Sequence, residues 1–250
     1  MLNKKLVELI KRHSKLLIFT GAGISTNSGI PDYRGPQGIW RHRQPVYYQD
    51  FMSSEKARVE YWASKMEGWD GFRDAKPNEA HKAIYKLETS GKLSMVVTQN
   101  IDGLHALAGT SEDKLVEIHG SNLDVECQSC WLKTEPEPHF AVFRQTGKAP
   151  LCEQCGGYLK PATISFGQSL RKVDLNRAAI AANQADMVIA LGSTLSVYPA
   201  ASFPLSAAQR GAPYVIINRG ETEHDHHPAV ALRLEGDVGE IFPQAVDEAV

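Results

Sequence analysis

Residues 19–40 read FTGAGISTNSGIPDYRGPQGIW, a glycine-rich turn that follows a short apolar run and leads into a segment rich in proline and glycine. Gly21 and Gly23 fit the first two positions of a G-x-G-x-x-G dinucleotide turn, in which the first glycine permits the bend and the second lets the backbone approach a pyrophosphate. Thr26 occupies the third position, and no clear acidic residue follows about 20 residues later to bind a ribose hydroxyl. The stretch is not a P-loop either, because no Gly-Lys-Ser/Thr follows. By itself it fits both a dinucleotide site and a tight strand-to-helix turn.

The composition is that of an ordinary globular protein with one large domain and room for a small satellite module. The 250 residues are 42% hydrophobic and 22% charged, and the formal net charge is -2. No basic field extends over the chain, so direct nucleic-acid binding is disfavoured. Small molecules and proteins remain as partners.

The first residues form an amphipathic pattern rather than a signal peptide. Residues 1–19 mix Lys4 and Lys5 with Leu6 and Leu9 and contain no continuous apolar core. A transit peptide is the alternative, but the pattern runs directly into the first predicted core strand. No apolar run approaches the ~20 residues of a membrane helix. We therefore expect a cytoplasmic protein without membrane contacts, in which cysteines stay reduced.

Short apolar runs alternate with helical patterns along the chain. Four runs, at residues 16–19, 95–98, 187–191 and 214–217, read as buried parallel strands. One helical pattern is capped by Asn78 and stops at Gly91, and another opens at Asp174. This alternation predicts an α/β fold with a doubly wound parallel sheet. Because such sheets bind ligands beyond the carboxyl ends of their strands, we expect TGAGIS, TQNID, GSTLS and INRG to meet in one crevice.

The four cysteines form two C-x-x-C pairs. Cys127 and Cys130 lie in CQSC, Cys152 and Cys155 lie in CEQC, and 21 residues separate the pairs. This spacing is close to that of two zinc knuckles that share one tetrahedral ion. Disulfides or four unrelated thiols are the alternatives, which a reducing compartment disfavours. A site of four thiolates has no open position for water, so the predicted zinc is structural and holds a small module together.

The motifs together resemble the sirtuins, which are NAD-dependent protein deacylases. GAGIS, GIPDYRGP, GIW, TQNIDGLH, IHG, the two C-x-x-C pairs, FG and GSTLSVYP follow the order of that family along nearly the whole chain. The resemblance implies a Rossmann-like parallel sheet with helices on both faces and a small inserted zinc-binding module. It divides the chain into an NAD-binding domain over residues 1–30, 75–122 and 161–250, a cofactor loop and helical segment over 31–74, and the zinc-binding module over 123–160.

The resemblance also implies roles for individual residues. His119 would be the general base, for which the near-neutral pKa of histidine is suited, and Asn100 would act with it in catalysis. The NAD phosphates would contact Gly21, Ala22, Gly23 and Ser25, and a cofactor loop that extends to Trp40 would contribute Asp32, Tyr33 and Arg34. The nicotinamide would contact Gln99, Asn100, Ile101 and Asp102. The adenosine half would contact Gly192, Ser193, Asn218, Arg219, Asp237 and Val238. The acyl-lysine peptide would add a strand between Phe166–Gly167 and Ser196–Val197–Tyr198. Without the family, Asn100 and Asp102 read as an ordinary turn and helix cap.

The implied reaction is lysine deacylation that consumes NAD. The acyl oxygen attacks the nicotinamide-bearing ribose carbon and expels nicotinamide. His119 then activates a ribose hydroxyl, and water releases lysine and O-acyl-ADP-ribose. Two other functions stay open: ADP-ribosyl transfer or NAD hydrolysis on the same scaffold, and a non-catalytic sensor that binds NAD and zinc. The protein substrate, the acyl chain and the oligomeric state stay open as well.

Four local patterns depart from the family or have no catalytic or binding role assigned by the resemblance. Gln168 follows FG where many sirtuins carry an acid, which leaves substrate choice open. The Tyr and Arg pair of relatives that act on acidic acyl groups is not evident in residues 58–69, so we expect weak desuccinylation. His105 and His81 read as packing residues, and residues 224–227, HDHH, read as a metal site or as a solvated loop.

Overall fold

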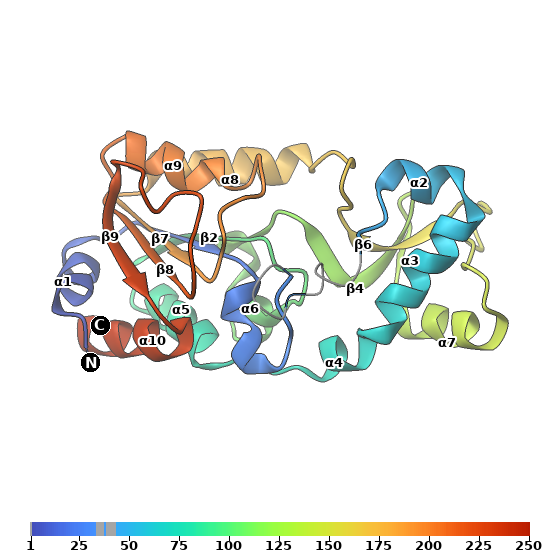
Figure 1. The fold of residues 1–250 in the computed structure, drawn as a ribbon, viewed down its shortest axis with the longest axis horizontal. Coiled ribbons are helices and arrows are strands. Elements are labelled where there is room, and N and C mark those ends of the chain that lie inside the picture. The colour runs from blue at the N-terminus through green and yellow to red at the C-terminus, as the bar shows by residue number, and fades with distance from the viewer. Residues whose placement is uncertain (1, 34–37, 39–43) are drawn as a thin grey trace.

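The computed structural model describes residues 2–33, 38 and 44–250, which form two lobes side by side (Figure 1). The larger lobe contains the strands β1 (Leu16–Thr20), β2 (Leu93–Thr98), β3 (Leu115–Glu117), β7 (Met187–Leu191), β8 (Tyr214–Asn218) and β9 (Val230–Glu235). They form one sheet in the order β3-β2-β1-β7-β8-β9, and every neighbouring pair is parallel. The predicted doubly wound α/β sheet is confirmed.

Helices cover both faces of this sheet. One face carries α1 (Lys4–Arg12), α5 (Glu79–Thr89) and α10 (Val238–Ala249), and the other carries α8 (Lys172–Gln184) and α9 (Ser202–Gln209) (Figure 1). All five residues of β1 are buried, because alternate side chains enter the two cores: Leu16 and Ile18 join one, Leu17 and Phe19 the other. This is why the central strands read as unbroken apolar runs.

The strands β1, β2, β7 and β8 end in register at their carboxyl ends, where the four predicted loops begin. Thr20, the last residue of β1, is opposite Thr98 of β2 and Leu191 of β7, and Leu191 is opposite Ile217 of β8. Parallel strands that stop in register deliver their following loops to one edge of the sheet. The predicted meeting of four loops therefore has a simple geometric basis.

The predicted helix start is right for α5 and late for α8. Asn78 caps α5, since its side chain accepts a hydrogen bond from the Ala80 amide at 3.0 Å. Helix α8 starts at Lys172, so Asp174 lies inside the first turn instead of at the cap. A carboxylate there still favours the helix because it faces the positive end of the helix dipole.

The smaller lobe combines the helices of residues 48–74 with the cysteine-rich segment. It contains α2 (Tyr48–Ser53), α3 (Glu55–Glu67), α4 (Trp69–Asp74) and α7 (Pro136–Thr146) beside an antiparallel sheet of β5 (Lys133–Thr134), β4 (Gly120–Cys127) and β6 (Leu159–Thr163). Trp62 of α3 is fully buried against Phe140 of α7, with the ring centroids 5.3 Å apart, and its Nε1 donates to the Leu159 carbonyl at 3.1 Å. The two segments thus share one core.

The four cysteines gather beside that core. Their Sγ atoms all lie within 4.8 Å of one another, with Cys127 and Cys155 at 3.5 Å and Cys130 and Cys152 at 3.7 Å. A disulfide needs about 2.05 Å, whereas sulfurs around a tetrahedral zinc are roughly 3.8 Å apart at a Zn–S distance of about 2.3 Å. The Cys127 thiolate would also accept hydrogen bonds from the amides of Ser129 at 3.4 Å and Cys130 at 3.5 Å. The cluster fits the predicted structural zinc and excludes disulfides in this geometry.

Among the helices of the described residues, we find none with the length and apolar character that crossing a membrane requires.

Replacing one metal ligand should loosen the smaller lobe. In Cys130→Ser, which removes a less buried ligand than Cys127, we expect loss of bound zinc and a red shift of tryptophan emission as Trp62 and Trp69 become hydrated. Metal analysis and fluorescence measure this, with Ser129→Ala as the neighbouring control. A zinc-free Cys130→Ser protein with native emission would refute a structural metal.

Candidate active site

The glycine-rich turn after β1 is in direct backbone contact with the loop after β7. Gly21 donates its amide to the Leu191 carbonyl at 3.0 Å, and Gly23 donates to the Gly192 carbonyl at 2.8 Å. A Cβ atom on Gly21 would lie 2.8 Å from the Gly192 oxygen, and one on Gly192 would collide with the Ile24 amide. Gly192 also has a φ of 60°, in the left-handed region that favours glycine. These glycines are thus needed for two loops to touch.

The turn continues as two short 3₁₀ turns, Ala22–Ile24 and Thr26–Ser28, and not as an α-helix. The Gly29 that follows is left-handed, with a φ of 83°, which ends the second turn. Asn78 steadies this stretch, because its Nδ2 donates to the Ile24 carbonyl at 2.8 Å. Sequence reasoning assigned Asn78 only to capping.

Three predicted NAD residues from two loops form one buried cluster. Ser25 donates its hydroxyl to Oδ2 of Asp102 at 2.7 Å, and Nδ2 of Asn100 donates to Oγ of Ser25 at 3.0 Å. All three side chains are buried, with Ser25 fully so. The hydrogen-bonded chain Asn100–Ser25–Asp102 joins the loop after β1 to the loop after β2.

Asp102 serves in this cluster and in the local turn at once. Its Oδ1 accepts from the Leu104 amide at 3.0 Å, which closes a turn just before α6 (Leu104–Leu107). The interpretation as a turn is therefore right, but the N-cap of α6 is Gly103, so Asp102 is not the helix cap. Burial raises the pKa of the Asp102 carboxyl, while the bonds from Leu104 and Ser25 act in the opposite direction. With hydrogen bonds to both of its oxygens, the buried Asp102 carboxyl is held in one orientation and can accept from donor groups of a ligand.

Gln99 connects the cluster to the β7 loop and to His119. Its Nε2 donates to Oγ of Ser193 at 2.8 Å, and its backbone carbonyl is 3.2 Å from Nδ1 of His119. Because a carbonyl can only accept, Nδ1 of His119 carries the proton, and the neutral ring presents Nε2 as a base. The backbone thus sets the tautomer that a general base requires.

His119 lies where the chain passes from one lobe to the other. Glu117 ends β3 of the large sheet and Gly120 begins β4 of the small one. The His119 carbonyl accepts from the Ile164 amide at 2.7 Å, just after β6. Gly120 has a φ of 73°, and any Cβ there would collide with the Ala162 carbonyl. The backbone on the carboxyl side of His119 is therefore held tightly against the smaller lobe.

Beneath these residues lies a buried polar relay that sequence reasoning missed. The Thr20 hydroxyl donates to the Thr98 hydroxyl at 2.7 Å, which in turn accepts from the Asn100 amide at 3.0 Å. Nε2 of His105 is 3.0 Å from the Thr20 hydroxyl. Burial holds the pKa of His105 well below its usual value, and that of the adjacent His81 at about 4, so both rings are neutral. The available signal was a threonine as the last residue of two adjacent strands.

The predicted adenosine side is tied together by Asp237. Its Oδ2 accepts from Arg219 at 2.8 Å and its Oδ1 from Asn27 at 3.0 Å, while the Asp237 side chain also caps α10. Val238 is buried in the core, so only its backbone could face a ligand. Asn27, which the sequence analysis did not select, joins the turn after β1 to the loop after β9, and Asp237 in turn binds Arg219 of the loop after β8.

The two predicted peptide-contacting segments are anchored separately. The Phe166 carbonyl accepts from the Tyr48 amide at 2.9 Å, and the Gly167 carbonyl accepts from Nε2 of Gln49 at 3.2 Å. Gln168 turns back onto its own loop, with Oε1 accepting from the Ser165 amide at 3.1 Å. On the other side, the Ser196 and Thr194 hydroxyls are 2.9 Å apart.

The predicted cofactor loop is described only at its start. Asp32 and Tyr33 are half-buried, and burial next to Asp102 raises the pKa of Tyr33 to about 12. Arg34 and Trp40 lie outside the described residues.

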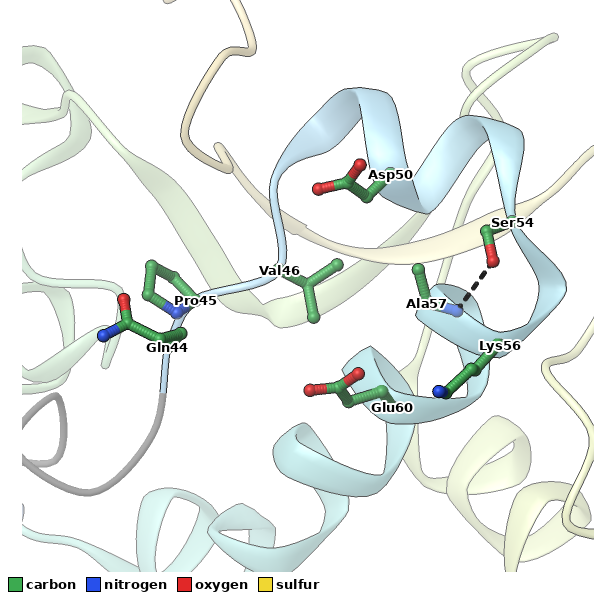
Figure 2. Close-up of a pocket in the computed structure, with 8 residues that line it drawn as sticks. All are labelled: Gln44, Pro45, Val46, Asp50, Ser54, Lys56, Ala57 and Glu60. Carbon is green, nitrogen blue, oxygen red and sulfur yellow. Dashed lines mark hydrogen bonds between the residues drawn. The ribbon is translucent and has the colours of Figure 1, made fainter.

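A separate cavity of about 320 Å³ lies between α2, α3 and the segment before them (Figure 2). The side chains around it include the Asp50 and Glu60 carboxylates, with Val46 between them in the view. Its lining is Gln44, Pro45, Val46, Asp50, Ser54, Lys56, Ala57 and Glu60, and contains none of the predicted site residues. We therefore assign the loops at the carboxyl ends of the strands, where hydrogen bonds join the predicted residues, as the candidate site.

Known proteins resemble this chain in both sequence and fold. A model of the Sir2 family matches residues 21–199. An NAD-dependent protein deacetylase of Rhodopseudomonas palustris is 40% identical over 237 residues, which cover 95% of this chain and 93% of the relative. A second, from Thermodesulfovibrio yellowstonii, is 42% identical over 221 residues, with 88% and 86% covered.

Solved structures of Sir2 proteins are also similar to this chain. A Sir2 structure with a deacetylated p53 peptide and 3′-O-acetyl-ADP-ribose superposes with a TM-score of 0.91 at 36% identity, covering 99% of this chain and 98% of that one. A Sir2 structure with a p53 peptide and NAD gives 0.88 at 35% identity, with 99% and 98% covered. The chain therefore belongs to the Sir2 family, the sirtuins.

Proposed function

We infer that the chain is an NAD-dependent protein deacetylase, which transfers the acyl group of a modified lysine to ADP-ribose and releases nicotinamide. One observation carries the assignment to this site. The Asn100–Ser25–Asp102 cluster and a histidine with its Nδ1 proton fixed by Gln99 lie at the same sheet edge. The family relatives provide the reaction, and this geometry provides groups that can perform it.

The nicotinamide carboxamide is proposed to bind against the cluster. A buried amide needs acceptors for its N–H groups and a donor for its oxygen, and leaving either unpaired costs about 1–3 kcal/mol. Asp102 offers carboxylate lone pairs, and Asn100 and the Ile101 backbone offer donors. Because Ser25 holds both side chains in place, their conformational entropy is already reduced before the ligand binds, and binding costs less free energy.

His119 is proposed to accept the proton of a ribose hydroxyl. The Gln99 contact places a proton on Nδ1, so Nε2 is the nitrogen that accepts a proton when the ring is neutral. The His119 carbonyl accepts from the Ile164 amide, which holds the backbone in place. With no serine or cysteine nucleophile assigned, the rate depends on holding the acyl oxygen, the ribose and this imidazole together.

The substrate is proposed to be a peptide segment that bears acyl-lysine, laid between Phe166–Gly167 and Ser196–Tyr198. Sir2 structures have been solved with p53 peptides and with a propionylated peptide, which supports an extended peptide and a short acyl chain here. Four thiolates reserved for a metal suit a compartment that keeps thiols reduced, so we propose the cytoplasm.

Removal of the base should separate binding from chemistry. We expect His119→Ala to bind NAD within about twofold of the unmodified chain, but to lose roughly 10²–10⁴ in turnover. Calorimetry and mass spectrometry of an acetyl-lysine peptide with NAD measure the two effects. An active His119→Ala protein would refute the assigned base, and nicotinamide release without any acylated peptide would favour NAD hydrolysis.

Removal of the central hydroxyl should weaken the nicotinamide pocket. Ser25→Ala leaves the buried Asp102 carboxylate with one donor fewer and frees Asn100, so the KM for NAD should rise about tenfold or more. Thr26→Ala is the matched control, because its hydroxyl bonds only the Gly23 carbonyl among the contacts in this turn. Equal KM values for the two variants would contradict the role of the cluster.

Acetyl-lysine should be preferred to succinyl-lysine. The arginine of residues 58–69, Arg58, binds the Phe51 carbonyl at 3.0 Å and stacks on Tyr158 at 3.8 Å, so it is committed to the smaller lobe. The buried Lys160 ammonium already donates to two backbone carbonyls. We expect a kcat/KM about tenfold higher or more for the acetyl peptide, because the succinyl carboxylate would lose its hydration without gaining a charged partner. A succinyl preference in a direct competition assay would contradict this expectation.

A further inference from the structure

His224 is a buried residue in an otherwise open loop. It is 2% exposed, whereas Glu223 and His226 are exposed and Asp225 and His227 half-buried. A buried imidazole within a polar loop must have both ring nitrogens satisfied, or it costs folding free energy. The identity of its two partners is therefore informative.

Both partners are tyrosine hydroxyls. Nδ1 is 3.0 Å from Oη of Tyr214, and Nε2 is 3.1 Å from Oη of Tyr198. The ring meets Tyr214 edge-on at 6.0 Å between centroids and Tyr198 at 6.4 Å. Burial and the neighbouring His227 lower the pKa of His224, which favours a neutral ring with one donor and one acceptor, and a hydroxyl can match either. With both nitrogens engaged, the metal-site interpretation of residues 224–227 has no support, and the four cysteines are the metal-type cluster found among the described residues.

The two tyrosines belong to different parts of the molecule. Tyr214 is fully buried in β8, a fixed element of the sheet. Tyr198 is 59% exposed and lies in the segment to which we assign one side of the peptide. His224 thus fastens an exposed side chain to a strand of the core.

The loop that holds His224 is itself rigidly attached. Asp225 accepts from the Thr222 hydroxyl at 2.6 Å and from Nε of Arg233 at 2.7 Å, and Arg233 also donates to the Asn218 carbonyl at 3.1 Å. A second connection, from the Glu223 amide to the Thr194 carbonyl at 3.0 Å, joins the same loop to the start of the peptide-contacting segment. Residues 194 and 198 are therefore both tied to residues 223–224.

We propose that His224 is a positioning residue that holds residues 194–198 in the conformation to which the acyl-lysine peptide adds as a strand. This deepens the proposed function and rests on it, because the segment matters only if a peptide binds there. A peptide held mainly by backbone hydrogen bonds needs an edge whose carbonyls and amides are already aligned. Ordering the edge in advance removes that entropic cost from binding, so loss of His224 acts on peptide affinity and leaves the chemical step intact.

The test compares ring-preserving variants of the full chain with an acetyl-lysine peptide and NAD. His224→Phe keeps the ring and removes both hydrogen bonds, so we expect the peptide KM to rise about fivefold or more, with kcat and the KM for NAD within about twofold. Tyr214→Phe removes one bond at a position buried in the core, and should raise the peptide KM in the same direction. His226→Phe, two residues away and exposed, is the matched control with no expected change.

Hydrogen exchange gives a readout that does not depend on turnover. Amides of residues 194–198 should exchange at least about tenfold faster in His224→Phe than in the unmodified chain, without faster exchange in β8. If His224 only stabilised the fold, His224→Phe would lower the melting temperature but would not raise the peptide KM while kcat stays unchanged.

Wild-type peptide KM and wild-type exchange in both His224→Phe and Tyr214→Phe would overturn the proposal while leaving the deacetylase assignment intact. Should His224→Phe fail to fold, Tyr214→Phe decides by the same measurements. Faster exchange of residues 194–198 in a protein that turns over no acyl peptide would support the tether and refute the proposed function instead.

Discussion

The backbone contact between Gly23 and Gly192 is the constraint on which the site depends. It brings the loops after β1 and β7 to van der Waals distance, and no side chain larger than hydrogen fits at Gly21, Gly23 or Gly192. Once these loops touch, Ser25 reaches Asp102 and Gln99 reaches Ser193, so side chains from three loops meet at this edge of the sheet. The register of β1, β2 and β7 makes this possible, because their ends are level.

The smaller lobe meets the candidate site at residues 118–119, between β3 and β4. His119 lies between the last strand residue of one sheet and the first of the other, and backbone bonds hold it to both: its ring to Gln99 and its carbonyl to Ile164. The position of His119 therefore depends on contacts with both lobes, and the shared core of α3, α7 and the cysteines holds the smaller lobe together.

The sequence predicted what depends on local pattern and on motif. Buried parallel strands appear as apolar runs, the Asn78 cap as a polar residue before a periodic helix, and the metal cluster as two spaced cysteine pairs. It did not predict what depends on tertiary contacts. In residues 48–74, α2 and α4 have only six residues each, and aromatic side chains of all three helices are buried in the smaller lobe, so the segment shows no clear apolar period. The sequence pattern also places the start of α8 at Asp174, whereas the helix begins at Lys172. Thr20, Asn27 and His224 gain their partners only when distant loops meet.

The most direct test of the account is a crystal structure with an acetyl-lysine peptide and a non-reactive NAD analogue. We expect the carboxamide to contact Asn100 and Asp102, and a hydroxyl of the attached ribose to lie within about 2.6–3.2 Å of Nε2 of His119. A dinucleotide bound elsewhere, or one whose ribose turns away from this imidazole toward solvent, would contradict it.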